Sequence, residues 1–128
     1  MRVLLDTHAF VWWNSDDPRL SRTARAVIQE PENEILLSAA SAWEIAIKYA
    51  RGRLPIPQPP ARYVADRMRR HGFGPLAIEI AHGVQVGSLP PIHRDPFDRI
   101  LVAQSQLENL PILTSDPNIA RYGVSVLW

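Results

Sequence analysis

Residues 2–6 read Arg-Val-Leu-Leu-Asp, an apolar run of strand-forming residues that stops abruptly at a carboxylate. Because this run is short, continuous and sharply bounded, we predict a buried first strand over Arg2–Leu5. The same kind of pattern predicts four further strands, at Ile35–Leu37, Leu76–Ile78, Ile112–Thr114 and Val124–Leu127.

Segments with helical spacing separate these runs. The predicted helices cover Pro18–Gln29, Ala39–Ala50 after a Ser38 N-cap, Ala61–His71, Glu79–Val86 and Pro96–Glu108. The four prolines between Leu54 and Pro60 cannot continue a helix, so we expect an extended connector between helices. Strands that alternate with helices imply a mostly parallel sheet with helices on both faces. A chain of 128 residues has the length of one domain, which we expect to span residues 1–128.

Composition narrows the classes of function. The chain has no cysteine, which excludes disulfides, zinc ribbons and thiol nucleophiles, and favours a reducing cytoplasm. We expect no membrane association, because no apolar stretch approaches the length of a span. The net charge is only +1, so any contact with a polyanion must come from local groups of basic residues. The candidates for contact with a nucleic-acid backbone such as RNA are Lys48, Arg51 and Arg99.

Five carboxylates are expected at one edge of the sheet. Asp6 directly follows the first strand, and Asp116 follows the predicted strand Ile112–Thr114. Glu44, Asp95 and Asp98 lie near the starts of two helices that face the same edge. So many negative charges are stable together only if cations or protons neutralise them, and oxygen ligands select Mg²⁺ or Mn²⁺. The natural reaction is hydrolysis of a phosphodiester.

Each acid also has a purely structural interpretation. Glu44 could complete a capping box with Ser41, Asp95 could be only a helix N-cap, and Asp116 could be a turn residue or cap. The helix dipole favours Asp98 in a first turn regardless of function. Asp6 is hardest to explain in this way, because a carboxylate gains little from burial at the end of a strand. Their joint placement on one edge argues for a common site.

The histidines and tryptophans suggest less. His8 and His93 are expected near the proposed cleft, and His71 and His82 at surface or cap positions, with no spacing typical of a zinc site. Apolar neighbours surround the tryptophans, which we expect to be core or interface residues rather than platforms for base stacking. They are Trp12, Trp13, Trp43 and Trp128.

The chain resembles PIN-domain ribonucleases, specifically VapC-type toxins of type II toxin–antitoxin systems. The matching stretches are Leu4–His8, Ser38–Lys48, His93–Gln104 and Leu113–Asp116, and they occur in the order of the family. The resemblance implies a three-layer α/β/α fold with a mostly parallel central sheet and metal-dependent endonucleolytic cleavage of RNA, often tRNA or rRNA. It also implies a homodimer that is held inactive by a small cognate antitoxin.

The resemblance also implies roles for individual residues. By motif, Asp6, Glu44 and Asp98 would organise Mg²⁺ or Mn²⁺, with Asp116 as the fourth catalytic member. Asp95 offers a further ligand in the same motif as Asp98. Two threonines match positions that support the site through hydrogen bonds, Thr7 and Thr114.

Other functions stay open or are disfavoured. The strongest rival is a non-catalytic RNA-binding or scaffolding PIN module, and a DNA-directed nuclease also stays open. A phosphoacceptor receiver domain should have an acidic pair near the first strand and a late lysine, but Thr7 follows Asp6 and the only lysine is Lys48. An aspartyl phosphatase should have a second acid where His8 stands.

Overall fold

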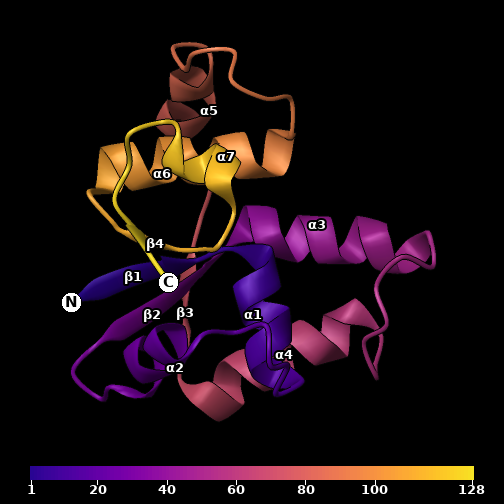
Figure 1. Ribbon diagram of the computed structural model, residues 1–128. Coiled ribbons are helices and arrows are strands. Elements are labelled where there is room, and N and C mark those ends of the chain that lie inside the picture. Colours follow the sequence, from indigo (N-terminus) through magenta and orange to yellow (C-terminus); the bar gives the residue numbers. More distant parts are fainter.

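The computed structural model describes residues 1–128 as a twisted sheet of short strands between two layers of helices (Figure 1). The five strands are β1 (Arg2–Leu5), β2 (Glu34–Ser38), β3 (Gly74–Leu76), β4 (Ile112–Leu113) and β5 (Val126–Leu127). They lie in the order β3-β2-β1-β4-β5, and each neighbouring pair is parallel. The predicted parallel α/β architecture is therefore confirmed.

Seven helices connect and cover these strands. They are α1 (Thr7–Asn14), α2 (Arg22–Gln29), α3 (Ala39–Ala50), α4 (Pro60–His71), α5 (Ile80–Val86), α6 (Pro96–Glu108) and α7 (Pro117–Ala120). In Figure 1, α1, α2 and α4 lie below the sheet, and α5, α6 and α7 lie above it. None of these helices combines the length and the apolar composition needed to cross a bilayer.

Two apolar clusters hold the layers to opposite faces of the sheet. Val3 and Leu5 pack with Phe10 of α1 and Tyr63 of α4, whereas Leu4 packs on the other face with residues of α6 and α7. This division follows from the alternation of side chains along a strand. Successive residues of a continuous apolar run therefore pack into the cores on opposite faces of the sheet. The sheet is covered on both faces, as is usual for parallel sheets.

Several boundaries differ from the predictions. Neither α1, which contains the apolar segment Phe10–Trp13, nor α7 was among the predicted helices. The helix expected from Pro18 begins at Arg22, because Ser21 accepts a hydrogen bond from the backbone of Ala24 and caps it there.

Three predicted strands are also displaced or shortened. The strand expected at Leu76–Ile78 lies at Gly74–Leu76, where its residues pair with Leu36, Leu37 and Ser38 of β2. The predicted strand Ile112–Thr114 ends at Leu113, and the last strand is only Val126–Leu127. The prediction of the helix Ala39–Ala50 is confirmed.

Candidate active site

Asp6 and Asp116 follow the two strands at the centre of the sheet. Leu5 and Leu113 are register partners in parallel β1 and β4, so the residues after them emerge at the same edge. The Thr114 hydroxyl donates a hydrogen bond of 2.5 Å to Asp6 Oδ2, and it accepts one of 3.0 Å from the Asp116 backbone. Thr114 therefore links the two acids, which fits its predicted supporting role.

The Asp6 side chain also caps α1. Its Oδ1 accepts a hydrogen bond of 2.7 Å from the backbone of Ala9, and the residue is only 5% exposed. Burial raises the pKa of Asp6, the hydrogen bonds from Thr114 and Ala9 lower it, and the negative charge of Asp116 raises it further. Asp116 is itself the N-cap of α7 and accepts from the backbone of Asn118.

Glu44 reaches the same edge from α3. It is 3% exposed, its Oε1 accepts a hydrogen bond of 2.6 Å from Thr7, and its Oε2 forms an ion pair with Lys48. The capping-box interpretation of Glu44 is wrong, because Ser38 caps α3 and Ser41 lies inside the helix. Thr7, the other predicted supporting residue, therefore contacts a predicted catalytic acid directly.

Asp95 and Asp98 lie at the start of α6. Asp95 Oδ1 accepts hydrogen bonds from the backbones of Phe97 and Asp98, at 2.9 and 3.1 Å, and so acts as the N-cap. Asp98 Oδ2 lies 3.1 Å from Nε2 of His93. Burial raises the pKa of Asp98 to about 7, the bond to His93 opposes this shift, and the negative charges of Asp95, Asp116 and Glu44 add to it.

These electrostatic effects show that the acids form one group. Three of the other acids raise the pKa of Asp98, and Asp116 raises the pKa of Asp6. The structure nevertheless contains no cluster of three or more His, Asp or Glu side chains placed to hold one metal ion. Three of the carboxylates each accept a hydrogen bond from a backbone N–H at a helix start, those of Asp6, Asp95 and Asp116. Carboxylate oxygens suit a hard divalent cation, and Lys48 offsets only the charge of Glu44. To bind one ion together, the acids would have to move closer around it.

The residues predicted to contact RNA occupy different surroundings. Arg51 is exposed at the end of α3, and Lys48 is paired with Glu44. Arg99 directs both terminal nitrogens to backbone carbonyls and to the Tyr122 hydroxyl. In this arrangement Arg99 holds a loop in place, and its N–H donors are already engaged within the protein rather than available to a phosphate.

Two residues near Asp98 were missed as parts of the site by sequence reasoning. His93 was predicted near the cleft without a role, and Tyr122, from the segment after α7, was not considered. They contact each other through His93 Nδ1 and the Tyr122 hydroxyl, at 2.7 Å. The pairing of residues 29 positions apart depends on the packing of α7 against α6, for which the sequence carries no local signal.

The other histidines and the tryptophans confirm only part of the prediction. His71 is exposed, and His82 occupies a cap position, because its Nδ1 accepts a hydrogen bond from the Glu79 backbone at the start of α5; both agree with the prediction, although His82 is buried. Trp43 is 55% exposed, and its ring meets the edge of Phe97 at 4.9 Å.

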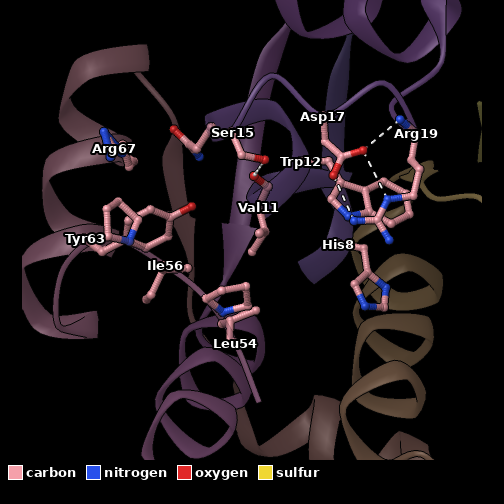
Figure 2. Close-up of a pocket in the computed structure, with 13 residues that line it drawn as sticks. His8, Val11, Trp12, Ser15, Asp17, Arg19, Leu54, Ile56, Tyr63 and Arg67 are labelled. Carbon is pink, nitrogen blue, oxygen red and sulfur yellow. Dashed lines mark hydrogen bonds and ion pairs between the residues drawn. The ribbon is translucent and has the colours of Figure 1, made fainter. Parts of the chain in front are cut away.

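A cavity of about 450 Å³ lies beside α1 (Figure 2). It is lined by residues of α1, by the proline-rich connector at 54–57 and by Tyr63 and Arg67 of α4. At one side His8 stacks on Trp12 at 5.3 Å, and the guanidinium of Arg19 lies over the same tryptophan at 4.7 Å. None of the five acids lines this cavity, so it is separate from the candidate active site.

Comparison with known proteins identifies the family of this fold and site. Residues 3–124 match the family model of the PIN domain, and the chain belongs to the PIN-domain family.

Two curated relatives have similar sequences. Ribonuclease VapC16 of Mycobacterium tuberculosis is 58% identical over 69 residues, which cover 51% of this chain and 49% of that protein. This alignment therefore spans only about half the length of that relative. Ribonuclease VapC22 of the same species is 28% identical over 117 residues, which cover 89% of this chain and 86% of the relative.

Solved structures support the fold alone. The structure of VapBC2 from Rickettsia felis bound to a DNA fragment from its promoter matches with a TM-score of 0.71 at 13% identity, over 98% of this chain and 97% of that one. The structure of VapBC-1 from nontypeable Haemophilus influenzae matches with a TM-score of 0.66 at 16% identity, over 98% of this chain and 96% of that one. The predicted three-layer PIN-like fold is confirmed.

Proposed function

We propose that the protein is an endoribonuclease that depends on Mg²⁺ or Mn²⁺ and acts as the toxin of a type II toxin–antitoxin module. The observation that carries this proposal is the group of carboxylates from four chain segments, in which Asp98 has a pKa raised to about 7 by burial and by other acids. Groups with strongly perturbed pKa values at the edge of a parallel sheet are candidates for catalysis. The names of the relatives, Ribonuclease VapC16 and Ribonuclease VapC22, support the same activity.

In this proposal Asp6, Glu44 and Asp98 hold the metal, and Asp116 completes the set. A bound divalent ion would supply an activated water and neutralise charge that develops on the phosphate. Thr114 orients Asp6, and Thr7 orients Glu44, through the hydrogen bonds described above. We assign Asp95 mainly to the cap of α6, from which its charge also acts on Asp98.

The proposed substrate is RNA, with tRNA or rRNA as the class that the family resemblance implies. Lys48 and Arg51 lie toward the end of α3, the helix that also carries Glu44, and Arg51 is exposed. A phosphate backbone that runs along this helix could reach both cations and the acidic site. Arg99 is retained only as an indirect contributor, because its donors are already occupied.

A cognate antitoxin is the proposed protein partner, since the structural neighbours include toxin–antitoxin complexes such as one from Klebsiella pneumoniae. A site rich in carboxylates suits an inhibitor that carries arginine. We also propose a homodimer and a cytoplasmic location for a single domain over residues 1–128. An apolar surface around α5 supports the dimer, because Ile80 is 88% exposed and Val84 72% exposed.

The second candidate is a PIN module that binds RNA without cleaving it. The observation in its favour is the lack of a cluster that would hold a metal in the present arrangement. The two candidates differ in whether the acids close around a cation when one is supplied.

The deciding experiment is cleavage of a total RNA preparation by the purified chain with Mg²⁺, with Mn²⁺ and with a chelator. Asp6→Asn is the test variant, and Glu32→Gln in an exposed turn is the matched control for loss of one carboxylate. We expect discrete fragments that require metal, persist in Glu32→Gln and disappear in Asp6→Asn. Cleavage that survives the chelator or Asp6→Asn would contradict the proposal, and RNA binding without cleavage would support the second candidate.

A further inference from the structure

A chain of hydrogen bonds leads to Asp98 from outside the group of acids. The Arg99 guanidinium donates to the Tyr122 hydroxyl at 3.0 Å, the hydroxyl lies 2.7 Å from His93 Nδ1, and His93 Nε2 lies 3.1 Å from Asp98 Oδ2. The members are largely shielded from water: Tyr122 is 8% exposed, and the side chains of His93 and Asp98 are 15% and 17% exposed. Hydrogen bonds with so little access to water are well suited to fix orientation.

The first bond of this chain has a fixed direction, and distances indicate the direction of the next one. An arginine side chain can only donate, so the oxygen of Tyr122 must accept from Arg99. Two acceptors lie within reach of the Tyr122 hydroxyl hydrogen, His93 Nδ1 at 2.7 Å and the His93 carbonyl at 3.5 Å, and we infer that the nearer one, Nδ1, accepts it. A neutral imidazole that accepts at Nδ1 carries its proton at Nε2, and from there it donates to the Asp98 carboxylate.

Arg99 also holds the loop that carries His93. Its terminal nitrogens donate to the carbonyls of Val86 and Pro90, at 3.3 and 2.9 Å, and Nη1 lies 3.4 Å from the carbonyl of His93 itself. The segment between α5 and α6 has no regular secondary structure of its own, so these bonds anchor it together with the packing of Leu89 and Ile92 against the core. One guanidinium therefore fixes both the backbone and the ring of His93.

We propose that Arg99, Tyr122 and His93 form a positioning relay, which holds His93 as the Nε2–H tautomer and orients the Asp98 carboxylate for a divalent cation. The metal-binding half of this inference rests on the proposed function, whereas the tautomer does not. His93 contacts Oδ2 of Asp98, and no protein donor contacts Oδ1. The relay therefore leaves Oδ1 as the oxygen that can bind a cation. Groups that orient a metal ligand in this way commonly affect metal affinity about as strongly as some ligands do.

The tautomer is tested on the metal-free protein by nitrogen NMR of ¹⁵N-histidine-labelled chain, at a pH well above the usual histidine range. We expect His93 to show an unprotonated Nδ1 and a protonated Nε2. In Tyr122→Phe the donor to Nδ1 is removed while the ring is kept, so the preference for this tautomer should weaken. A proton on Nδ1 in the wild-type protein, with or without one on Nε2, would overturn the relay.

The effect on Asp98 is tested by titration with Mn²⁺, with Tyr49→Phe as the matched control at a partly exposed tyrosine on α3. We expect Tyr122→Phe to weaken Mn²⁺ binding by ~10-fold, the lower end of such indirect effects, and Tyr49→Phe to leave it unchanged. Asp98→Asn is titrated alongside. If Asp98→Asn binds Mn²⁺ as the wild type does, the proposed metal site fails. If only Asp98→Asn is impaired, the site stands and the relay is wrong.

A second pair of variants separates a hydrogen bond from simple packing at position 93. His93→Gln can still present an amide N–H toward Asp98, whereas His93→Leu fills the space without a donor. We expect Mn²⁺ affinity to stay closer to wild type in His93→Gln than in His93→Leu, when both are folded by circular dichroism. Equal loss in the two variants would show that the donor to Asp98 is irrelevant and would overturn the proposal.

Discussion

Glu44 is buried and Asp98 partly buried at the same edge of the sheet, yet their charges have different surroundings. Glu44 has a cation within reach, Lys48 one helical turn away, and also accepts a hydrogen bond from Thr7. Asp98 has only the His93 ring as a partner and is surrounded by other acids, which together with burial bring its pKa to about 7. The charge of Glu44 is compensated within the chain, and that of Asp98 is not.

This difference indicates where an added cation has the most to gain. A metal ion beside Asp98 would replace repulsion by attraction, whereas beside Glu44 it would have to compete with Lys48. We infer that the Asp98 half of the site dominates the response to metal. Glu44 then acts as a preorganised ligand that Lys48 and Thr7 hold in place.

Replacement of Asp98 should have the largest effect. In Asp98→Asn we expect RNA cleavage to fall by ~10²-fold or more, because a main electrostatic element of the site is lost. The same change should make the metal-free protein more stable at neutral pH, since it removes a buried charge from among like charges. Initial cleavage rates and thermal denaturation in chelator measure the two effects.

Glu44→Gln is the matched variant for this comparison. It should also lower cleavage, but it should destabilise the metal-free protein because Lys48 loses its partner. If Asp98→Asn is destabilised to the same degree as Glu44→Gln, the contrast between the two acids is wrong.

The sequence was sufficient to predict much of the scaffold. The run Arg2–Leu5 and the helix Ala39–Ala50 have local patterns that admit one interpretation, and parallel strands then bring Asp6 to the edge where Glu44 and Asp98 also emerge. The presence of a three-layer fold and the shared location of the acids follow from such local features together with topology.

Other features depend on packing that local patterns do not encode. The segment Phe10–Trp13 has no polar residues at helical spacing, so its sequence pattern does not distinguish a helix from a strand. The structure shows a helix, α1, which Asp6 caps. The ion pair of Glu44 with Lys48 agrees with helical spacing, but the capping-box pattern at Ser41 misled because the helix starts three residues earlier. The relay through Tyr122 depends on a contact between segments far apart in the chain.

Lower pH should stabilise the metal-free protein, because protonation of Asp98 removes a charge that burial and the neighbouring acids destabilise. Its pKa in the folded protein is about 7, against an ordinary value of 3.8, so between these limits the folded state binds the additional proton. Stability from this group is therefore greatest at the acidic end of that window and is lost as pH rises through about 7. We expect the melting temperature of metal-free wild type to fall by several degrees relative to Asp98→Asn over this range.

The difference between the two proteins is the quantity to measure, because other titrating groups affect both alike. Added Mn²⁺ should remove most of the fall in the wild type and have little effect on Asp98→Asn. A difference in melting temperature that stays constant with pH would show that the folded protein does not take up a proton at Asp98 in this range, and would contradict the prediction.

The smallest expected effect is at Asp95, whose charge acts on Asp98 but whose oxygen is engaged with the backbone of α6. Asparagine caps helices about as well as aspartate, so Asp95→Asn should change the free energy of unfolding by only a few tenths of a kcal/mol, whereas Asp95→Ala should cost about 1 kcal/mol. Cleavage by Asp95→Asn should fall much less than in Asp98→Asn, as measured by initial rates on the same RNA. If Asp95→Asn instead loses as much cleavage activity as Asp98→Asn while its stability is unchanged, Asp95 is a metal ligand. Both acids of α6 would then belong to the part of the site whose charge has no compensating cation in the chain.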